Sequence, residues 1–218
     1  MRVSEAKWIR GALKGIDGPI LNLGSSTKTF REDLKPHIDR EVFSPLRADG
    51  VEVVHADMKQ APGVDLVGDI TDPVYQEQLV ARHFRAILVS NLLEHVRDPG
   101  IVADACRRIL PEGGLICVTG PYRYPYHADP IDTMYRPTPE EFASLFKGEL
   151  VVGEIIDGGT LRDDVRSLPH YLAQSGWRIL NWPRRPKAAR ARASALTYLF
   201  RPFEISCAVI RIGTSGVS

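Results

Sequence analysis

Strand-like and helix-like segments alternate along the first 120 residues of the chain. The strand-like segments are short apolar runs rich in valine, isoleucine and leucine, a composition typical of strands that helices cover on both faces. Such alternation predicts parallel strands joined by crossover helices. The five expected strands lie at residues 20–23, 51–57, within 64–73, at 84–89 and at 115–119.

Between and after these strands, apolar residues at helical spacing predict helices at 4–14, 29–34, 74–83, 99–110 and 139–146. We expect Pro36 to end the second helix and Pro45 to interrupt the less regular stretch that follows it. Thr138 and Glu141 predict a capping box at the start of the last helix. Further strands are expected at 150–156 and 204–212, with helices at 165–172 and 188–200 between them.

Size and composition suit one compact domain. The 218 residues are 44% hydrophobic and 25% charged, which is enough to bury a full core. A formal net charge of +1 gives no reason to expect nucleic acid as a partner. No apolar run approaches the ~20 residues that cross a bilayer, and the first residues lack the apolar stretch of a signal peptide. Cys106, Cys117 and Cys207 lie far apart in apolar surroundings, which predicts reduced core residues and a cytoplasmic location.

The first strand runs into a turn of small residues, Gly24-Ser25-Ser26-Thr27. Glycine adopts backbone angles that are closed to other residues and has no side chain to block a ligand. In an open α/β sheet, the turn after the first strand is where a nucleotide-like cofactor binds. Two interpretations stay open here: a cofactor-binding turn, or an ordinary connection between a strand and a helix.

Acidic residues follow the second and third strands. Asp57 ends the second strand, where a carboxylate can accept hydrogen bonds from both hydroxyls of a ribose. The alternative for Asp57 is a solvated strand end or a helix cap. Asp69 follows the third strand within a cluster of Asp, Gly and Pro that equally suits a turn.

A family resemblance is carried by Leu93-Glu94-His95-Val96, with Asn91 before it and Asp98-Pro99 after it, and by Arg107–Leu115 with its glycine pair. In these residues the chain resembles the class I S-adenosylmethionine-dependent methyltransferases, of the methyltransferase type 11 kind, over about residues 18–150. The resemblance implies a Rossmann-like doubly wound α/β sheet of about seven strands, mostly parallel. It places an antiparallel last strand at the sheet edge, beside the sixth strand.

The same resemblance implies a single domain over 1–218. Its core would span about 18–158 and 203–213, with a helical insertion at about 161–201. The implied cofactor is S-adenosylmethionine. The family's turn, acidic-x-Gly-x-Gly-x-Gly, corresponds here to Asn22-Leu23-Gly24-Ser25-Ser26-Thr27.

Carried over by position, Asn22 replaces the acid that helps to anchor the methionine part of the cofactor, and Ser26 replaces the second glycine. Gly24 and the turn around it, with Ser25, would face the methionine end. Asp57 would bind the ribose. Asp69 and Ile70 would flank the adenine. Asn91 and Leu92 would line the floor of the pocket near the sulfonium. The resemblance also implies that Glu94 and His95 help to shape the pocket, unless His95 packs against or caps the following helix.

The segment 120–141 follows the fifth strand and contains five prolines and four tyrosines. Prolines stiffen such a loop, and loops at the carboxyl ends of strands carry function in this architecture. We expect the loop to hold a polar, sugar-like or carboxylated acceptor, or else to pack as a structural loop across the sheet edge. The residues expected to bind the acceptor are Tyr122, Tyr124, Tyr126 and Arg136.

His127 is the candidate general base of this loop, because an imidazole titrates near neutral pH. Asp129 or Asp132 would orient it. No metal is expected, since only one histidine lies near these two acids in the sequence.

A basic run at 184–192 follows Trp177 and Trp182. It suits either contact with an anionic partner or a solvated helix face.

These features predict S-adenosylmethionine-dependent methyl transfer to a small or carbohydrate-linked acceptor. The alternative is a catalytically inactive methyltransferase-like module that binds or regulates. A nicotinamide-dependent oxidoreductase is disfavoured by the single glycine in the turn and by the absence of a second nucleotide-binding half. The sequence makes no prediction of the oligomeric state.

Overall fold

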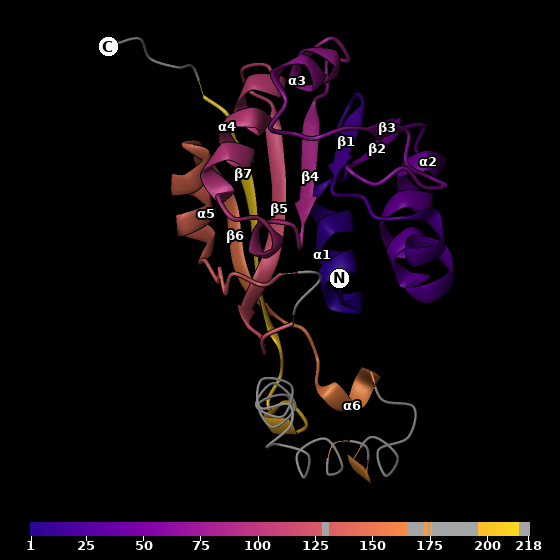
Figure 1. Cartoon of the computed structure of the whole chain (residues 1–218), viewed down its shortest axis with the longest axis vertical. Helices are drawn as coiled ribbons and strands as arrows, with labels where there is room; N and C mark the ends of the chain where they lie inside the picture. The colour runs from indigo at the N-terminus through magenta and orange to yellow at the C-terminus, as the bar shows by residue number, and fades with distance from the viewer. Residues whose placement is uncertain (128–130, 165–171, 174, 176–195, 214–218) are drawn as a thin grey trace.

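A computed structural model describes residues 1–127, 131–164, 172–173, 175 and 196–213 of the chain. Its centre is a seven-stranded sheet in the order β3-β2-β1-β4-β5-β7-β6 (Figure 1). The first five strands pair in parallel, and β7 is antiparallel to both of its neighbours. This topology confirms the expected fold class. The strands are β1 Ile20–Leu23, β2 Val53–Asp57, β3 Leu66–Val67, β4 Ala86–Ser90, β5 Leu115–Arg123, β6 Glu149–Asp157 and β7 Glu204–Arg211.

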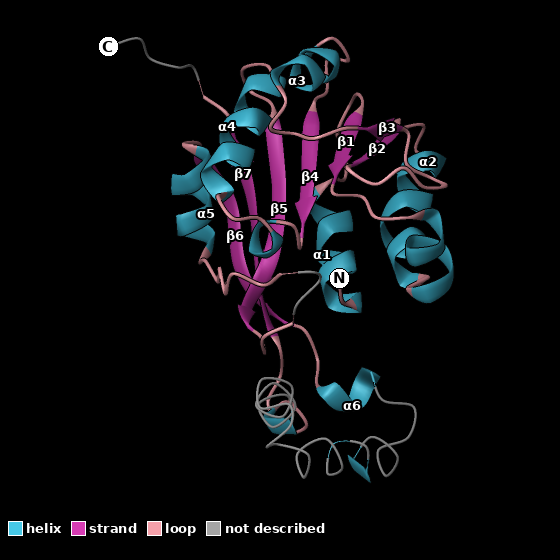
Figure 2. Ribbon diagram, viewed as in Figure 1, coloured by secondary structure: helices cyan, strands magenta, loops and turns pink. Residues whose placement is uncertain are grey.

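Helices cover both faces of the sheet (Figure 2). Three of them, α3, α4 and α5, begin with the same device: a side-chain oxygen of Asp72, Asp98 or Thr138 accepts a backbone N–H of the first turn, and a proline follows. A proline at the first helical position costs no hydrogen bond, so this pair fixes the helix start. The α-helices are α1 Val3–Ala12, α2 Ser44–Ala48, α3 Pro73–Val80, α4 Pro99–Ile109, α5 Pro139–Phe146 and α6 Leu161–Asp164.

Alternate residues of the central strands supply two separate cores. Leu21 and Leu23 of β1 face α3, α4 and α5, whereas Ile20 faces α1 and the helical segment that ends in α2. Both layers are apolar, so the central strands are buried throughout, as the continuous apolar runs predicted. The sheet therefore presents polar groups mainly at its strand ends.

The stretch 37–48 is more helical than predicted, since the sequence indicated one short helical turn and a break at Pro45. It is helical, with a π-helical turn at Asp39–Phe43 running directly into α2. The Ser44 N–H donates to the Asp39 carbonyl, five residues back, so the helix widens before Pro45 and the proline falls in the first turn of α2. A proline tolerated there does not break the helix. A second π-helical turn, Phe30–Leu34, ends just before Pro36, as predicted.

The last strand was expected at the sheet edge, and this was wrong. β7 lies between β5 and β6, and β6 forms the edge. The burial of the two strands gives the reason: Ile205–Ile210 is buried without a break, whereas most side chains of β6 are exposed. β5 also continues past Thr119 to Arg123, because its pairing with β7 extends to Glu204.

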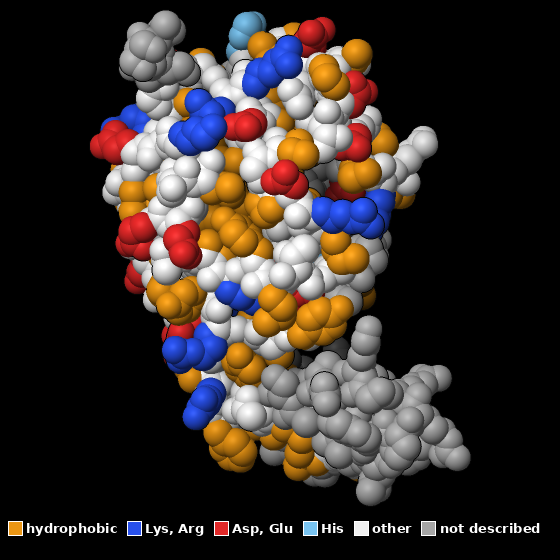
Figure 3. All heavy atoms as spheres, turned by 60° about the vertical axis from the view of Figure 1, so that its left-hand side comes forward, with side chains coloured by type: hydrophobic (Ala, Val, Ile, Leu, Met, Phe, Trp, Pro, Cys, Tyr) orange, Lys and Arg blue, Asp and Glu red, His pale blue; other side chains and the backbone are white. Residues whose placement is uncertain are grey.

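Several sequence predictions fall outside the described residues. These are the helix at 165–172, most of the helix at 188–200, the basic run 184–192, and Asp129. No described helix is long and apolar enough to cross a membrane. On the face drawn in Figure 3, acidic and basic side chains are interspersed, in keeping with a net charge of +1.

The burial difference between two leucines predicts different costs of truncation. Leu21 is 0% exposed in β1, whereas Leu34 is 70% exposed. We expect Leu21→Ala to lower the free energy of unfolding by about 3 kcal/mol, through lost transfer energy and a cavity. Leu34→Ala should change it by less than about 0.5 kcal/mol. Urea denaturation measures both, and equal losses would show that the β1 core is not packed as described.

Candidate functional site

The polar strand ends converge where the order of the sheet reverses. β1 pairs with β2 on one side and β4 on the other, with Leu23 opposite Ala56 and Val89. The chain therefore leaves β1, β2 and β4 at one edge. Ligands of open α/β sheets bind at such a switch point, outside the carboxyl ends of the strands. Gly24, Asp57 and Asn91 follow or end these three strands, so the fold brings together residues that are far apart in the sequence.

The turn after β1 contains two residues with left-handed backbone angles. Gly24 has φ +70° and Ser26 has φ +56°. For a serine this conformation costs about 1–2 kcal/mol. Its backbone is held by hydrogen bonds on both sides: Ser26 N donates to Asp57 Oδ2 at 2.8 Å, and its carbonyl accepts from Arg31 Nη1 at 2.8 Å. Ser26 thus takes the glycine-like geometry through its partners.

Arg31 holds the turn from beneath, a role that sequence reasoning missed. Its side chain is almost fully buried, and besides Ser26 it donates to the carbonyls of Ser25 at 2.9 Å and Gly63 at 2.7 Å. Carbonyl oxygens satisfy the guanidinium donors without a carboxylate partner. The only sequence signal was a charged residue in the first turn after the small-residue stretch.

Asp57 ends β2 beside this turn. Each carboxylate oxygen accepts one backbone N–H: Oδ2 from Ser26 at 2.8 Å, and Oδ1 from Lys59 at 3.0 Å. A carboxylate oxygen has two lone pairs, so both oxygens keep acceptor capacity. The side chain is half-buried. Asp57 therefore has a structural role in the turn and can also accept further hydroxyl donors.

Asn22 is engaged with a neighbouring strand. Its Nδ2 lies 2.9 Å from Nδ1 of His55 in β2, and the His55 ring meets Phe43 edge-on at 4.8 Å. An amide Nδ2 can only donate, so His55 Nδ1 accepts and the imidazole is neutral. Burial, and then the charge of Arg31, lower the pKa of His55 to about 4.

A buried carboxylate from the N-terminal helix meets the end of β4 and the middle of β5. Glu5 of α1 is 1% exposed, and its Oε1 accepts from Asn91 Nδ2 at 2.6 Å, Thr119 Oγ1 at 2.7 Å and Ser90 Oγ at 3.2 Å. The side chain of Asn91 is thereby held toward α1. Sequence reasoning missed Glu5, although a charged residue beside the apolar positions of a short amphipathic helix was a usable signal.

Leu92 packs directly over Gly24. A Cβ built on Gly24 would lie 2.9 Å from Leu92 Cδ1, so the absence of a side chain at Gly24 allows this close approach. At the far side of the edge, Asp69 is exposed and its Oδ1 accepts from both N and Oγ1 of Thr71 at 2.8 Å. Asp69 has the turn geometry that was its alternative interpretation. Ile70 is buried, with its carbonyl bound by Gln76.

The loop after β5 brings aromatic residues to the same end of the sheet. The Tyr124 ring stacks on Phe203 at 4.6 Å between centroids and lies 5.1 Å from the His127 ring. Tyr122 is half-buried within β5, and Tyr126 is 49% exposed. Of the predicted acceptor residues, Tyr124 thus has its ring against that of His127.

His127 is oriented by Asp132. Its Nδ1 lies 3.4 Å from Asp132 Oδ2, and its backbone N–H donates to the same oxygen at 2.9 Å. Arg136 forms a bidentate pair with Asp132, with Nη2–Oδ2 at 2.7 Å and Nη1–Oδ1 at 3.1 Å. The guanidinium that was expected to hold an acceptor is therefore used, at least in part, to fix Asp132. Burial lowers the pKa of His127.

Glu94 is a further buried carboxylate at this end. It is 1% exposed, and burial raises its pKa to about 7. Its Oε1 lies 3.7 Å from His95 Nε2 and 4.0 Å from His127 Nε2. The two histidines meet edge-on, with ring centroids 5.3 Å apart.

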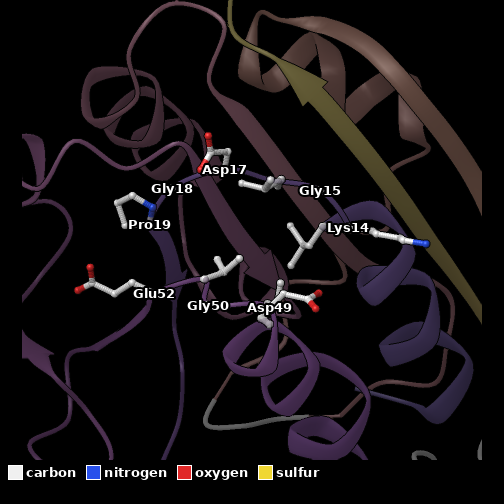
Figure 4. Close-up of a pocket in the computed structure, with 12 residues that line it drawn as sticks. Lys14, Gly15, Asp17, Gly18, Pro19, Asp49, Gly50 and Glu52 are labelled. Carbon is white, nitrogen blue, oxygen red and sulfur yellow. The ribbon is translucent and has the colours of Figure 1, made fainter.

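A pocket lies at the opposite end of the strands. It is formed by the turns before β1 and β2, where Gly15, Pro19 and Asp49 surround it (Figure 4). These are the amino ends of the strands, far along β1 and β2 from Gly24 and Asp57. Strand direction therefore separates this pocket from the switch-point edge.

Several solved structures of similar architecture are those of methyltransferases. Coclaurine N-methyltransferase bound to N-methylheliamine and S-adenosylhomocysteine is 13% identical, with a TM-score of 0.56 over 96% of this chain and 70% of that one. A SAM-dependent methyltransferase from Archaeoglobus fulgidus is 14% identical, with a TM-score of 0.50 over 94% of each chain. The fold is that of the class I methyltransferases. The MccD protein is 12% identical, with a TM-score of 0.55 over 95% of this chain and 96% of that one. By sequence, no family model and no curated protein matches the chain.

The buried guanidinium under the turn predicts a large effect on stability. We expect Arg31→Met to lower the free energy of unfolding by about 3 kcal/mol, because three carbonyls lose their donor in a buried place. Arg40→Met is the matched control, since Arg40 has an exposed side chain. Urea denaturation of both variants is the measurement. A loss no larger than that of the control would mean that Arg31 does not hold the turn.

The low pKa of His55 predicts a loss of stability in acid. The pKa of His55 in the folded state lies below the usual value of about 6.5. Between pH 6.5 and pH 4 the unfolded chain therefore binds more protons than the folded one, and the free energy of unfolding decreases as the pH is lowered. From pH 7 to pH 5 we expect the wild type to lose about 2 kcal/mol more than His55→Gln. Denaturation curves at the two pH values test this. Parallel losses would contradict a neutral, buried His55.

Proposed function

We propose that this chain transfers the methyl group of S-adenosylmethionine to a small or carbohydrate-linked acceptor. The observation that carries the proposal is the turn after β1, whose left-handed Gly24 and Ser26 are bonded to the Asp57 carboxylate at the switch point. The class I methyltransferase fold supports it, and one structure of this fold is described in complex with S-adenosylhomocysteine.

The residues at this edge suit an adenosyl ligand. Asp57 keeps acceptor capacity on both carboxylate oxygens, which suits the two hydroxyls of a ribose. Gly24 has no side chain, and the peptides of Ser25 and Ser26 are fixed by Arg31, so the turn is rigid before a ligand arrives. When bound, the cofactor supplies a methyl group on a sulfonium, ready for attack by a nucleophile.

Further contacts to the cofactor are proposals carried by position. Asn91 and Leu92 would form the floor beneath the sulfonium, and Asp69 with Ile70 would flank the adenine. Asn22 fits its proposed contact less well, since its amide already donates to His55. The hydrogen bonds of the Asn91 side chain, one to Glu5 and one to Ser90, leave the residue fixed rather than free to turn.

The acceptor would lie between this edge and the loop after β5. The protein's task is to align the nucleophile with the methyl group and to exclude water. Tyr122, Tyr124 and Tyr126 are the proposed acceptor contacts, together with Arg136 where it is not bound to Asp132. If the acceptor is a protonated hydroxyl, His127 is the proposed general base, with Asp132 as the partner that orients it.

The alternative function is that of an inactive binding module. Two observations favour this alternative: Ser26 stands in place of a glycine, and the Asn22 amide is bonded to His55. The two proposals differ in turnover. A chain that binds S-adenosylmethionine but methylates none of a panel of amine, hydroxyl and sugar acceptors would support the module.

Binding of S-adenosylhomocysteine to Asp57 variants tests the cofactor site. We expect Asp57→Asn to weaken binding at least tenfold, about 1.4 kcal/mol, because an amide accepts only one of the two ribose hydroxyls well. Asparagine keeps an oxygen for the Ser26 N–H, so the variant should fold. Asp49→Asn is the matched control, at the opposite end of the strands.

Isothermal titration calorimetry measures all three proteins, and circular dichroism checks that they are folded. A wild-type protein that binds neither S-adenosylhomocysteine nor S-adenosylmethionine would overturn the proposed function. A folded Asp57→Asn with unchanged affinity would remove the ribose assignment alone.

A further inference from the structure

Three side chains of metal-ligand type converge beside the proposed acceptor loop. One ligand atom from each of Glu94, His95 and His127 lies within 4.8 Å of the others. Glu94 and His95 come from the 3-10 turn Leu93–His95 after β4, and His127 comes from the loop after β5. Both histidine Nε2 atoms face the same carboxylate oxygen, Glu94 Oε1, at 3.7 Å and 4.0 Å.

Glu94 Oε1 independently points to a ligand. The side chain is 1% exposed, and within the part of the chain that the structure describes this oxygen has no hydrogen-bond partner. Burying a carboxylate oxygen without a donor is costly, and such atoms are rare in folded proteins. A positive ion between Glu94 and the two imidazoles would satisfy it.

The other nitrogen of each imidazole is already held by an acceptor. His95 Nδ1 lies 2.6 Å from the carbonyl of Ile131, and a carbonyl only accepts, so Nδ1 carries the proton. His127 Nδ1 lies 3.4 Å from Asp132 Oδ2 and 3.4 Å from the carbonyl of Pro125. Both Nε2 lone pairs therefore face Glu94. Metal-binding histidines are oriented in this way, through their distal nitrogen.

We propose that Glu94, His95 and His127 bind a divalent first-row transition metal, with zinc as the first candidate. Two imidazoles and one carboxylate form a three-residue site that leaves a fourth position open. With metal–ligand bonds of about 2.0–2.2 Å and tetrahedral angles, neighbouring ligand atoms lie roughly 3.4 Å apart. The separations from Glu94 Oε1 need to close by about half an ångström, and the widest separation in the cluster, up to 4.8 Å, by up to about 1.4 Å. Magnesium and calcium, which prefer oxygen ligands, suit the site less well.

Such a metal would join the acceptor loop to the end of β4. Its open position would face the region proposed for the acceptor, where it could bind an acceptor oxygen or nitrogen. His127 Nε2 cannot both bind the metal and take a proton, so in the loaded protein this site replaces the general-base role of His127. The site itself does not depend on S-adenosylmethionine.

Zinc binding by the full chain tests the proposal. The protein is treated with a chelator, exchanged into metal-free buffer, and titrated with zinc chloride in a calorimeter without any S-adenosyl compound. We expect one zinc ion per chain with a dissociation constant of about 1 μM or lower. Glu94→Gln and His127→Gln should each weaken binding at least tenfold. His83→Asn is the matched control and should bind as the wild type does, since His83 is exposed and asparagine tolerates its φ of +53°.

A spectrum of the cobalt-substituted wild type keeps the test valid even if a variant fails to fold. Visible absorption typical of four-coordinate cobalt, without a sulfur-to-metal band, supports a site of nitrogen and oxygen ligands. A wild type that binds no zinc, a sulfur-to-metal band, or folded variants with unchanged affinity would overturn the proposal. Because S-adenosylhomocysteine binding is measured separately, the metal site and the cofactor site can fail independently.

Discussion

The backbone conformation of Ser26 determines the geometry of the candidate cofactor edge. A serine with φ +56° is strained. The strained angle is maintained because one charged side chain binds the N–H of Ser26 and another binds its carbonyl oxygen. Asp57 accepts its N–H, and Arg31 donates to its carbonyl. A glycine would adopt this angle freely. Here the carboxylate and the guanidinium provide the geometry, and they also connect the end of β2 to the turn after β1.

A second polar contact fixes the other half of the edge. Glu5 accepts three hydrogen bonds, from Ser90 and Asn91 at the end of β4 and from Thr119 beside them in β5, so α1 is attached to the sheet at the level of the switch point. A buried carboxylate is tolerated when its charge is fully hydrogen-bonded. Its position means that a displacement of α1 would also displace Asn91, whose side chain is bonded to Glu5.

Most of the fold could be predicted from local patterns. Apolar runs at 20–23 and 84–89, and starts such as Asp98-Pro99, determine strands and helices within a few residues. Two features were predicted wrongly. Pro45 lies inside a helix because the preceding turn widens, and the place of β7 depends on which of two late strands is more apolar. Neither the widened turn before Pro45 nor the position of β7 in the sheet follows from the apolar pattern of the neighbouring sequence.

The candidate site was predictable in its positions but not in its contacts. Residues at strand ends are brought together by topology alone, so Gly24 and Asp57 could be paired from the sequence. Arg31 and Glu5 could not be assigned, because their partners are backbone carbonyls or residues more than 80 positions away. The Glu94 cluster was missed for the same reason: Glu94 and His127 meet only once the loop folds back.

The loop after β5 is anchored to the segment that follows β4. The Glu94 carbonyl accepts from N of Thr133 at 2.9 Å and from its Oγ1 at 3.1 Å, so the loop is bonded to the backbone that follows Leu92. Leu92 in turn packs on Gly24. A contiguous path of contacts therefore runs from the exposed Thr133 of the loop, through buried Glu94 and half-buried Leu92, to the turn after β1. The loop after β5 and the turn after β1 thus share one support, the backbone at residues 92–94.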